Sequence, residues 1–389
     1  MTSYFLLRWL DLKKVIIFLF ASIFFIKIVN ANELSQYAQS AILIEPTTNT
    51  VLYDKNMHER RPPASMTKLM TMLLIMEAID DGKISLEDKV LISKNSASMG
   101  GSQVFLQENM EIEVEQLIKG IAIASGNDAA VAMAEYIGGT TDEFVNMMNQ
   151  KAADLGLENT HFVNVHGLDA DDHYSSAYDM AQIARELLKH DKILNYTSLY
   201  EDYLVKPDGT KTWLVNTNKL VRFYSGVDGL KTGYTGTAGY CLTATALKNG
   251  IRFITVVMGV DTSEHRSADT TSLLNYAFNT YKLNTILKTE DIVDSINIKK
   301  GKQNTANLVP VENVTDLIKQ NEKKEYTYNI SKFKVVAPVN KGDVVGEIEV
   351  VDNSGKVVKK VGLTVTEVIE KHSFFSLFIE NLKKVINGF

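Results

Sequence analysis

The chain has almost no cysteine and no excess of positive charge. Its 389 residues include one cysteine, Cys241, which excludes an intramolecular disulfide. The net charge of −6 leaves no basic surface of the kind that binds nucleic acid, so we expect no nucleic-acid partner. Hydrophobic residues make up 45% and charged residues 23%, which is typical of a globular protein, and the length suffices for two domains.

Apolar runs long enough to span a membrane are also missing. The run VIIFLFASIFFI has 12 residues, whereas a spanning helix needs about 20. Lys13 and Lys14 precede it, and small residues follow as far as Ala31. This pattern predicts a signal peptide over residues 1–31, so we expect the working part of the protein to be exported to the outer face of the cytoplasmic membrane and the cell-wall space. Lys27 interrupts the pattern, which leaves an uncleaved anchor as the alternative.

Residues 37–282 mix strand and helix patterns. SAILIEPTTNTVLYD is typical of two short strands around a polar turn, and a helix-rich stretch follows. Near the end of this range, GYCLTATAL and IRFITVVMGV flank an Asn-Gly pair, a strong hairpin signal. The pattern predicts an α/β (α+β) domain in which one antiparallel sheet packs against a helical region.

The remainder of the chain has a different character. Over residues 284–365, VVGEIEVVD and KVVKKVGLTV alternate around turns and predict a small all-β domain. Residues 366–389 predict an amphipathic helix that lies on a membrane surface without spanning it, although packing against the β-rich domain is the alternative. The apolar stripe of this helix consists of Phe374, Phe378, Leu382, Val385 and Phe389.

A serine and a lysine stand three residues apart in PPASMTKLM, as Ser65 and Lys68. On a helix these two positions share one face, with Cβ atoms about 5–6 Å apart. The apolar stretch MTKLMTMLLIMEAI predicts that this helix is buried, and burial lowers the pKa of an amine. A second Ser-x-x-Lys, at Ser331 and Lys334, lies in a strand-like stretch, where positions three apart point to opposite faces.

Two further motifs carry polar groups that suit a reaction site. Ser125 and Asn127 interrupt an apolar stretch, where they need buried partners, or else simply cap an interhelix turn. Lys231 and Thr232 offer a charge and a hydroxyl for a carboxylate, and Gly233 leaves room for a substrate backbone. The alternative for this stretch is a glycine-rich turn with a solvated lysine.

In this order, the three motifs resemble the active-site triplet of penicillin-binding proteins and serine β-lactamases. More narrowly, the chain is similar to low-molecular-mass penicillin-binding proteins, which are serine-type D-alanyl-D-alanine carboxypeptidases of peptidase family S11. The similarity extends over nearly the whole chain and includes HGLDADDHYSSAYDMA. It implies a penicillin-binding-protein/β-lactamase-like transpeptidase fold and removal of the terminal D-alanine from peptidoglycan stem pentapeptides. It also implies covalent binding of β-lactam antibiotics and no cofactor or metal.

The resemblance assigns catalytic roles to three of these residues. Ser65 is the expected nucleophile, Lys68 its base, and Ser125 the group that relays a proton to the leaving D-alanine. Lys68 can act as a base only when neutral, and both burial and the second cation, Lys231, favour its neutral form.

The remaining motif residues are expected to bind substrate. Asn127 holds the substrate amide, and Lys231 and Thr232, in the strand that continues through Gly233, bind the terminal carboxylate. The backbone N–H groups of Ser65 and Tyr234 form the oxyanion hole.

The chain departs from many relatives at two places. Tyr234 stands where they have histidine, and Asn216 and Thr217 stand where Gram-negative relatives carry an arginine that helps to bind the carboxylate.

Three other functions compete with this one. A serine β-lactamase needs a group that activates water for deacylation, and the sequence contains no Glu-x-x-Leu-Asn motif. An inactive binding or scaffold protein is the second. The third is a zinc peptidase, although the sequence contains no His-Glu-x-x-His helix. Its ligands would come from His161, His166, Asp169 and His173.

Overall fold

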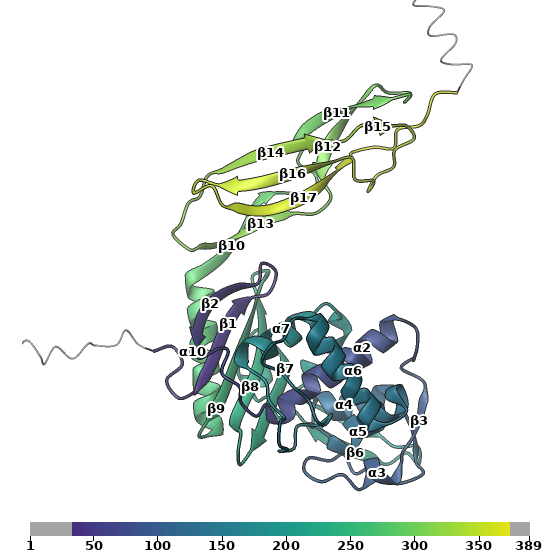
Figure 1. Ribbon diagram of the computed structural model, residues 1–389, viewed down its shortest axis with the longest axis vertical. Helices are drawn as coiled ribbons and strands as arrows, with labels where there is room; N and C mark the ends of the chain where they lie inside the picture. Colours follow the sequence, from purple (N-terminus) through teal and green to yellow (C-terminus); the bar gives the residue numbers. More distant parts are fainter. Residues whose placement is uncertain (1–32, 374–389) are drawn as a thin grey trace, which may run out of the picture.

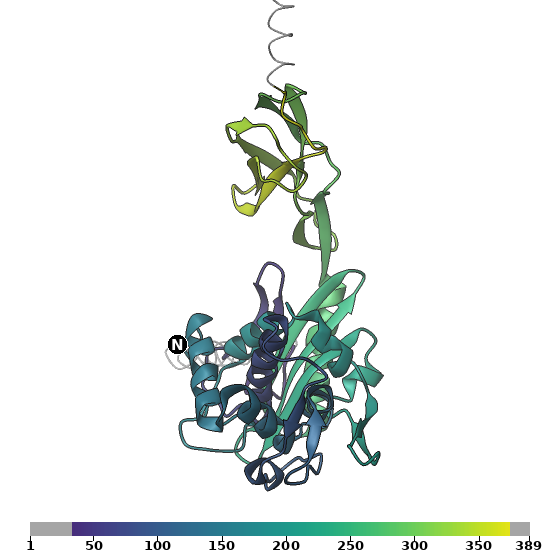
Figure 2. The same cartoon turned by 90° about the vertical axis from the view of Figure 1, so that its right-hand side faces the viewer.

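The computed structural model describes residues 33–373 (Figure 1). The predicted signal peptide and residues 374–389 of the predicted amphipathic helix lie outside the described residues. Figures 1 and 2 show an elongated molecule in which a mixed helix-and-sheet region and a β-rich region follow one another along the long axis.

One antiparallel sheet organises the first region. Its five strands lie in the order β2-β1-β9-β8-β7, so β1 of the N-terminal strand pair lies between β2 and β9, which comes from the end of the region. The strands are β1 (Ser40–Glu45), β2 (Thr50–Lys55), β7 (Val227–Thr235), β8 (Gly239–Lys248) and β9 (Ile251–Val260).

The turn between β8 and β9 confirms the predicted hairpin. Asn249 and Gly250 have φ angles of 51° and 78°. This left-handed pair matches the type I′ geometry for which Asn-Gly is favoured.

Both faces of this sheet are buried. In β1, Ile42 and Ile44 pack into the core shared with the helical region, whereas Ala41 and Leu43 pack into the core beneath α10 (Ser263–Thr280). Because side chains alternate across a strand, a strand covered on both faces becomes apolar at every position. This explains why SAILIE contains no polar–apolar alternation.

Helices form the other layer of the first region. The longer ones are α2 (Lys68–Asp80), α4 (Val114–Ala122), α5 (Asn127–Gly138), α6 (Thr141–Asp154) and α7 (Ala177–Leu187). The first region also contains the short helices α3 (Lys94–Ala97), α8 (Leu194–Thr197) and α9 (Leu220–Phe223). Two small two-stranded sheets pair β3 (Lys89–Leu91) with β4 (Glu111–Glu113) and β5 (Glu201–Val205) with β6 (Lys211–Val215).

Helix α2 is the buried helix expected after Ser65, but its start differs from the expectation. Residues Ala64–Thr67 form a 3₁₀ turn, and the α-helix begins only at Lys68. Ala64 has a φ of 47°, outside the helical range, so a regular α-helix does not extend back through Ser65.

The second region is built from strands, as predicted. Strand β10 follows α10 directly and pairs with β13, and the other strands form a six-stranded sheet in the order β14-β16-β17-β12-β11-β15 around a separate apolar core. The strands are β10 (Tyr281–Leu287), β11 (Asp294–Lys299), β12 (Thr305–Pro310), β13 (Val314–Lys319), β14 (Tyr326–Lys332), β15 (Val335–Val336), β16 (Gly346–Asp352) and β17 (Val357–Val365).

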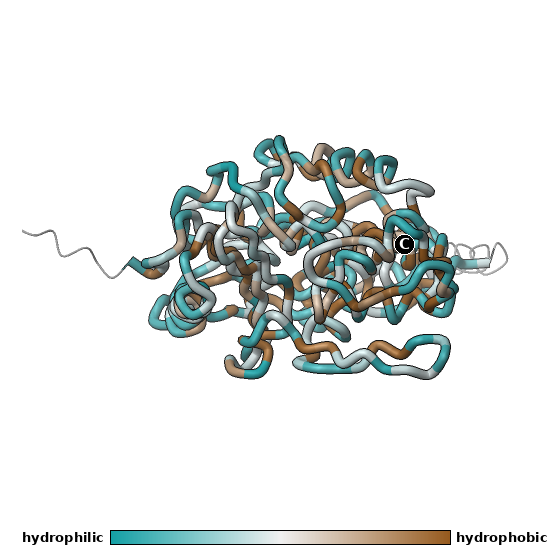
Figure 3. The backbone as a smooth tube through the Cα atoms, turned by 90° about the horizontal axis from the view of Figure 1, so that it is seen from below, coloured by the Kyte–Doolittle hydropathy of each residue, from teal (hydrophilic) through white to brown (hydrophobic). Residues whose placement is uncertain are grey.

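Viewed from below, hydrophobic and hydrophilic stretches alternate along the backbone (Figure 3). Over residues 33–373, no helix combines the length and apolarity needed to cross a bilayer.

Candidate active site

Lys68 lies at the centre of the three sequence motifs. Its side chain is fully buried, and its Nζ lies 3.0 Å from Ser65 Oγ, 2.6 Å from Asn127 Oδ1 and 2.7 Å from the carbonyl oxygen of His166. The structure therefore brings the first and second motifs together on one amine.

The surroundings of Lys68 favour its neutral form. Burial holds the pKa of Lys68 well below 10.5, the nearby charge of Lys231 lowers it further, and Asp128 opposes them. A lysine whose pKa is lowered in this way is suited to act as a base.

The hydrogen-bond partners of Lys68 then determine the direction of proton transfer. A neutral amine has two N–H donors and one lone pair. The His166 carbonyl and Asn127 Oδ1 can only accept, so they take both donors. The orientation of the Asn127 amide is fixed, because its Nδ2 donates to the carbonyl of Gly100 at 2.7 Å. In the neutral amine the lone pair would then remain for the Ser65 hydroxyl, 3.0 Å away, and general-base activation of a serine requires this arrangement.

Two glycines allow other segments to approach the Ser65 turn. Gly167 has a φ of 91°, and a Cβ on it would lie 1.9 Å from the carbonyl oxygen of Ala64. A Cβ on Gly233 would lie 2.7 Å from the carbonyl oxygen of Pro63 and 3.2 Å from the amide nitrogen of Ser65. The predicted close approach at Gly233 is thus made by the Ser65 turn itself. Both glycines hold the turn between the loop after His166 and strand β7.

Ser125 lies in the turn between α4 and α5 and is 3% exposed. Its φ of 64° is unusual for a serine, and within the described structure its Oγ is buried without a hydrogen-bond partner. Strained backbone and an unpaired buried hydroxyl both have a free-energy cost, and such features concentrate at functional sites.

A buried carboxylate holds the segment that packs on this turn. Asp128 is 1% exposed, and its carboxylate accepts the N–H groups of Val104, Leu106 and Ala129 at 2.9–3.1 Å. Between the first two of these residues, Phe105 has a φ of 61°. The Ser-x-Asn turn and the loop that covers it are therefore fixed by one side chain.

Lys231 and Thr232 lie on β7. Lys231 is 1% exposed, and burial and the neighbouring Arg266 lower its pKa to about 7. The hydroxyl of Thr232 donates to the hydroxyl of Thr217 at 2.7 Å. Thr217, noted in the sequence only as the residue in place of an arginine, therefore belongs to the same cluster of polar groups.

Tyr234 is the first exposed residue after the buried part of β7. Its side chain is 57% exposed and its ring lies 4.3 Å from that of Tyr240. The side chain lies beside Tyr240 of the neighbouring strand β8, whereas the expected contribution of Tyr234 to the oxyanion hole concerns its backbone N–H.

The four candidate zinc ligands have other partners. His173 Nε2 lies 2.8 Å from Thr67 Oγ1, and its Nδ1 accepts the N–H of Val163 at 3.0 Å. Asp169 accepts a hydrogen bond from Thr235. Among residues 33–373, no group of three histidine, cysteine or acidic side chains is arranged to hold a metal ion.

Several contributions to the site could not be identified from motif spacing. All of them depend on contacts between segments that are distant in the sequence. They are the carbonyl of His166, the close approach of Gly167, the hydroxyl of Thr217 and the hydrogen bonds from backbone N–H groups to the Asp128 carboxylate. The only signal for the first two was the HGLDADD stretch, which contributed to the family resemblance without an assigned role.

Comparison with known proteins gives matches over both regions. A family model for D-alanyl-D-alanine carboxypeptidase matches residues 27–262, and a model for the C-terminal domain of penicillin-binding protein 5 matches residues 281–371. The D-alanyl-D-alanine carboxypeptidase DacF of Bacillus subtilis (strain 168) is 49% identical over 347 residues, which cover 89% of each chain. The D-alanyl-D-alanine carboxypeptidase DacA of Escherichia coli (strain K12) is 37% identical over 355 residues, which cover 89% of this chain and 87% of the relative.

Solved structures agree with these matches. Penicillin binding protein 5 from Haemophilus influenzae superimposes with a TM-score of 0.70 at 31% identity and covers 86% of this chain and 98% of its own. Penicillin-binding protein D2 from Listeria monocytogenes, solved in an ampicillin-bound form, gives a TM-score of 0.56 at 32% identity and covers 62% of this chain and 97% of its own.

Proposed function

Because the chain belongs to the family of serine-type D-alanyl-D-alanine carboxypeptidases, we propose that Ser65 is its nucleophile and that it removes the terminal D-alanine from peptidoglycan stem pentapeptides through an acyl-enzyme. The observation that carries this proposal is the contact of Ser65 Oγ with the buried amine of Lys68, whose two donors are taken by other acceptors.

Acylation begins with proton transfer from Ser65 Oγ to Lys68 Nζ. The oxygen attacks the carbonyl carbon of the penultimate D-alanine, and a tetrahedral oxyanion forms. The N–H groups of Ser65 and Tyr234 stabilise this oxyanion, with the close packing of Gly233 on the Ser65 turn in support.

Collapse of the tetrahedral species breaks the bond to the terminal D-alanine. The leaving nitrogen takes a proton from Ser125 Oγ, which regains one from Lys68. The unpaired, buried hydroxyl of Ser125 supports this relay. Water then attacks the acyl-enzyme, releases the shortened peptide and restores the Ser65 hydroxyl.

The substrate carboxylate binds Lys231 and the hydroxyls of Thr232 and Thr217. Arrival of the carboxylate favours the charged form of Lys231, whose pKa burial lowers in the free enzyme. Asn127 Oδ1 continues to accept a hydrogen bond from Lys68, and the second hydrogen of Asn127 Nδ2 remains to donate to the substrate amide. β-Lactams, which carry a strained amide and a carboxylate, fit the same groups.

Labelled penicillin tests the proposal. We expect a covalent adduct on Ser65, located by peptide mapping, and release of D-alanine alone from a peptide that ends in D-Ala-D-Ala. Ser65→Ala should abolish both, and Lys68→Ala should slow acylation by at least about 10³-fold because the nucleophile loses its base. An adduct on another residue, or near-normal acylation of Lys68→Ala, would contradict the assignment.

We further propose that the enzyme is exported and held at the outer face of the cytoplasmic membrane. The lysines and apolar run before Ala31 support export, and the apolar stripe beyond residue 373 supports attachment. A cell-wall substrate requires an exported enzyme.

A further inference from the structure

The β5–β6 ribbon presents large aromatic side chains to solvent. Tyr203 and Trp213 are direct cross-strand partners and are 49% and 60% exposed. Val205 lies on the same face and is 40% exposed, whereas Leu204 and Leu214 on the opposite face are buried. The alternation is regular, so the aromatic pair is not a displaced part of the core.

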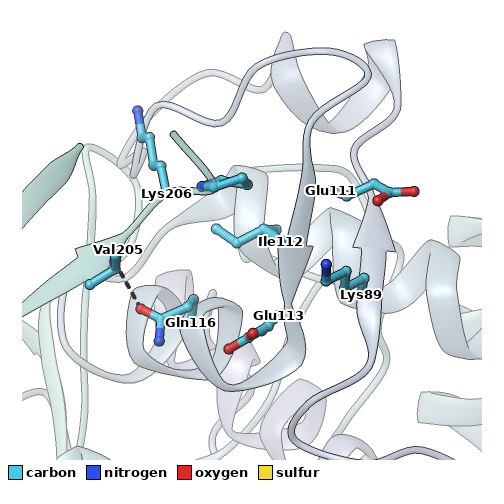
Figure 4. Close-up of a pocket in the computed structure, with 8 residues that line it drawn as sticks. Lys89, Glu111, Ile112, Glu113, Gln116, Val205 and Lys206 are labelled. Atoms are coloured by element: carbon cyan, nitrogen blue, oxygen red, sulfur yellow. Dashed lines mark hydrogen bonds between the residues drawn. The ribbon is translucent and has the colours of Figure 1, made fainter. Parts of the chain in front are cut away.

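The ribbon is held rigidly through its buried face. Asp202 forms an ion pair with Lys119 at 2.9 Å, and the N–H of Val205 donates to Gln116 Oε1 at 2.9 Å, as the dashed line in Figure 4 shows. At its tip, Lys206 Nζ donates to the carbonyl of Phe105. A rigid aromatic surface loses little side-chain entropy on binding, which favours recognition.

The groove beneath the ribbon differs from its outer face. It has a volume of about 290 Å³ and is lined by charges of both signs, including Lys89, Glu113 and Lys206 (Figure 4). No aromatic side chain lines this groove, so the aromatic surface of the ribbon is its outer face.

The ribbon leads directly into the proposed active site. Strand β6 ends at Val215, and two residues later Thr217 accepts the hydrogen bond from Thr232. Four residues of chain span at most about 13–14 Å, so Trp213 lies no farther than this from Thr217. In a stem pentapeptide, four residues separate the sugar attachment from the scissile bond, and fully extended they span about 13–14 Å. The stem peptide is therefore long enough for its sugar to reach the aromatic pair.

We propose that the outer face of the β5–β6 ribbon binds the glycan strand that carries the stem peptide, with Tyr203 and Trp213 packed against the sugar rings; this inference rests on the proposed carboxypeptidase function. The axial C–H groups of a pyranose ring form a flat apolar face that matches an aromatic ring. Glu201 and Lys211 lie on the same face of the ribbon and supply hydrogen-bonding groups for hydroxyls and acetamides. Charges at this position suit a glycan better than the acyl chains of a lipid.

A double variant separates glycan binding from chemistry. Tyr203→Thr/Trp213→Thr keeps residues of high strand propensity. We expect kcat/KM to stay within about twofold of wild type on a free peptide ending in D-Ala-D-Ala, and to fall at least about tenfold on the same peptide attached to a glycan chain. The matched control is Tyr328→Thr on β14, an exposed strand tyrosine (46%) in the other region, which should change neither value. Equal effects on both substrates, or none, would overturn the inference.

A binding measurement tests the same surface without turnover. The chain has two tryptophans, Trp9 and Trp213, so Trp9→Phe leaves the ribbon as the one source of tryptophan fluorescence. Titration with a peptide-free oligomer of N-acetylglucosamine should give a saturable change in that fluorescence. If an oligoglucose of equal length gives the same change, the ribbon binds the sugar rings; if it gives none, the ribbon also binds the acetamide groups. A lack of response to both sugars, or a response to anionic phospholipid vesicles alone, contradicts glycan binding. If the wild-type enzyme releases no D-alanine from the free peptide, or forms no adduct with penicillin, the proposed function is contradicted instead. The fluorescence titration does not depend on that result.

Discussion

At the scale of single residues, the proposed mechanism requires two buried lysines in opposite charge states. In it, Lys68 acts while neutral, and Lys231 binds a carboxylate while charged. Burial lowers the pKa of both, and the charge of Lys231 lowers that of Lys68 further. The two lysines therefore have to be considered together.

These pKa shifts predict a bell-shaped pH dependence of kcat/KM. Burial and the charge of Lys231 lower the pKa of Lys68, and loss of its proton activates Ser65, so the rate increases along the acidic limb. As pH rises further through about 7, Lys231 of the free enzyme loses its charge and carboxylate binding weakens. Because kcat/KM reports the free enzyme, its alkaline limb should lie near pH 7, whereas that of kcat should lie higher, since bound substrate keeps Lys231 charged.

The Lys231→Arg variant provides the control for this profile. Arginine stays charged throughout this range, so the alkaline limb should disappear even if the rate is lower. An unchanged alkaline limb in Lys231→Arg would assign it to a different group.

Gly167 should be as important as the residues that perform chemistry. Gly167→Ala combines a left-handed φ with a clash on the carbonyl of Ala64, so we expect a loss of about 2 kcal/mol or more in the free energy of unfolding and a much slower acylation of Ser65. Gly236→Ala is the matched control, because no atom lies within 4 Å of the added Cβ. Denaturant titration and penicillin labelling measure the two effects. Wild-type values for Gly167→Ala would show that the loop does not hold the Ser65 turn.

At the scale of elements, Asp128 couples the start of α5 to the loop over it. Asp128→Asn replaces one accepting oxygen by a donor that faces backbone N–H groups, and we expect a loss of about 2–4 kcal/mol in stability. The carboxylate also raises the pKa of Lys68, so the acidic limb of kcat/KM should move to lower pH in the variant. Asp208→Asn, which removes an exposed carboxylate bound to Thr210, should change neither quantity. An acidic limb that stays in place would rule out an electrostatic effect of Asp128 on Lys68.

The elements also show what the sequence could predict. The Asn249-Gly250 hairpin, the buried helix after Ser65 and the β-rich second region were all predictable, because each depends on local periodicity or turn chemistry. The fold class and the carboxypeptidase family are confirmed by the family and structure matches. The 3₁₀ turn at Ala64 and the contact of Lys68 with the His166 carbonyl were not predictable, since both depend on a loop about a hundred residues away. The assigned roles of the motif residues remain predictions.

At the scale of the whole molecule, the tail should attach the enzyme to a membrane without taking part in catalysis. Deletion of residues 374–389 should leave activity on a free peptide unchanged and abolish cosedimentation with anionic vesicles. Replacement of Lys383 and Lys384 by glutamine in the full chain is a milder variant and should weaken binding in a salt-dependent manner. If the shortened protein binds vesicles as well as the full chain does, another surface makes the attachment. If it loses stability, the stripe packs on the protein instead.

The strand order of the catalytic sheet has a consequence for the time at which the protein becomes an enzyme. Strand β1 lies between β2 and β9, and Ser40 pairs opposite Met258. Because a chain is synthesised from its N-terminus, β1 is made long before β9, one of the two strands that flank it. Until β9 arrives, the apolar side chains of β1 are uncovered and one of its edges has no partner, the state in which chains are most open to misassociation. Lys231 and Thr232, the proposed carboxylate-binding residues, also follow Ser65 by more than 160 positions, so Ser65 meets them only near the end of synthesis of this region. The enzyme therefore gains its activity only when nearly the whole catalytic region is present.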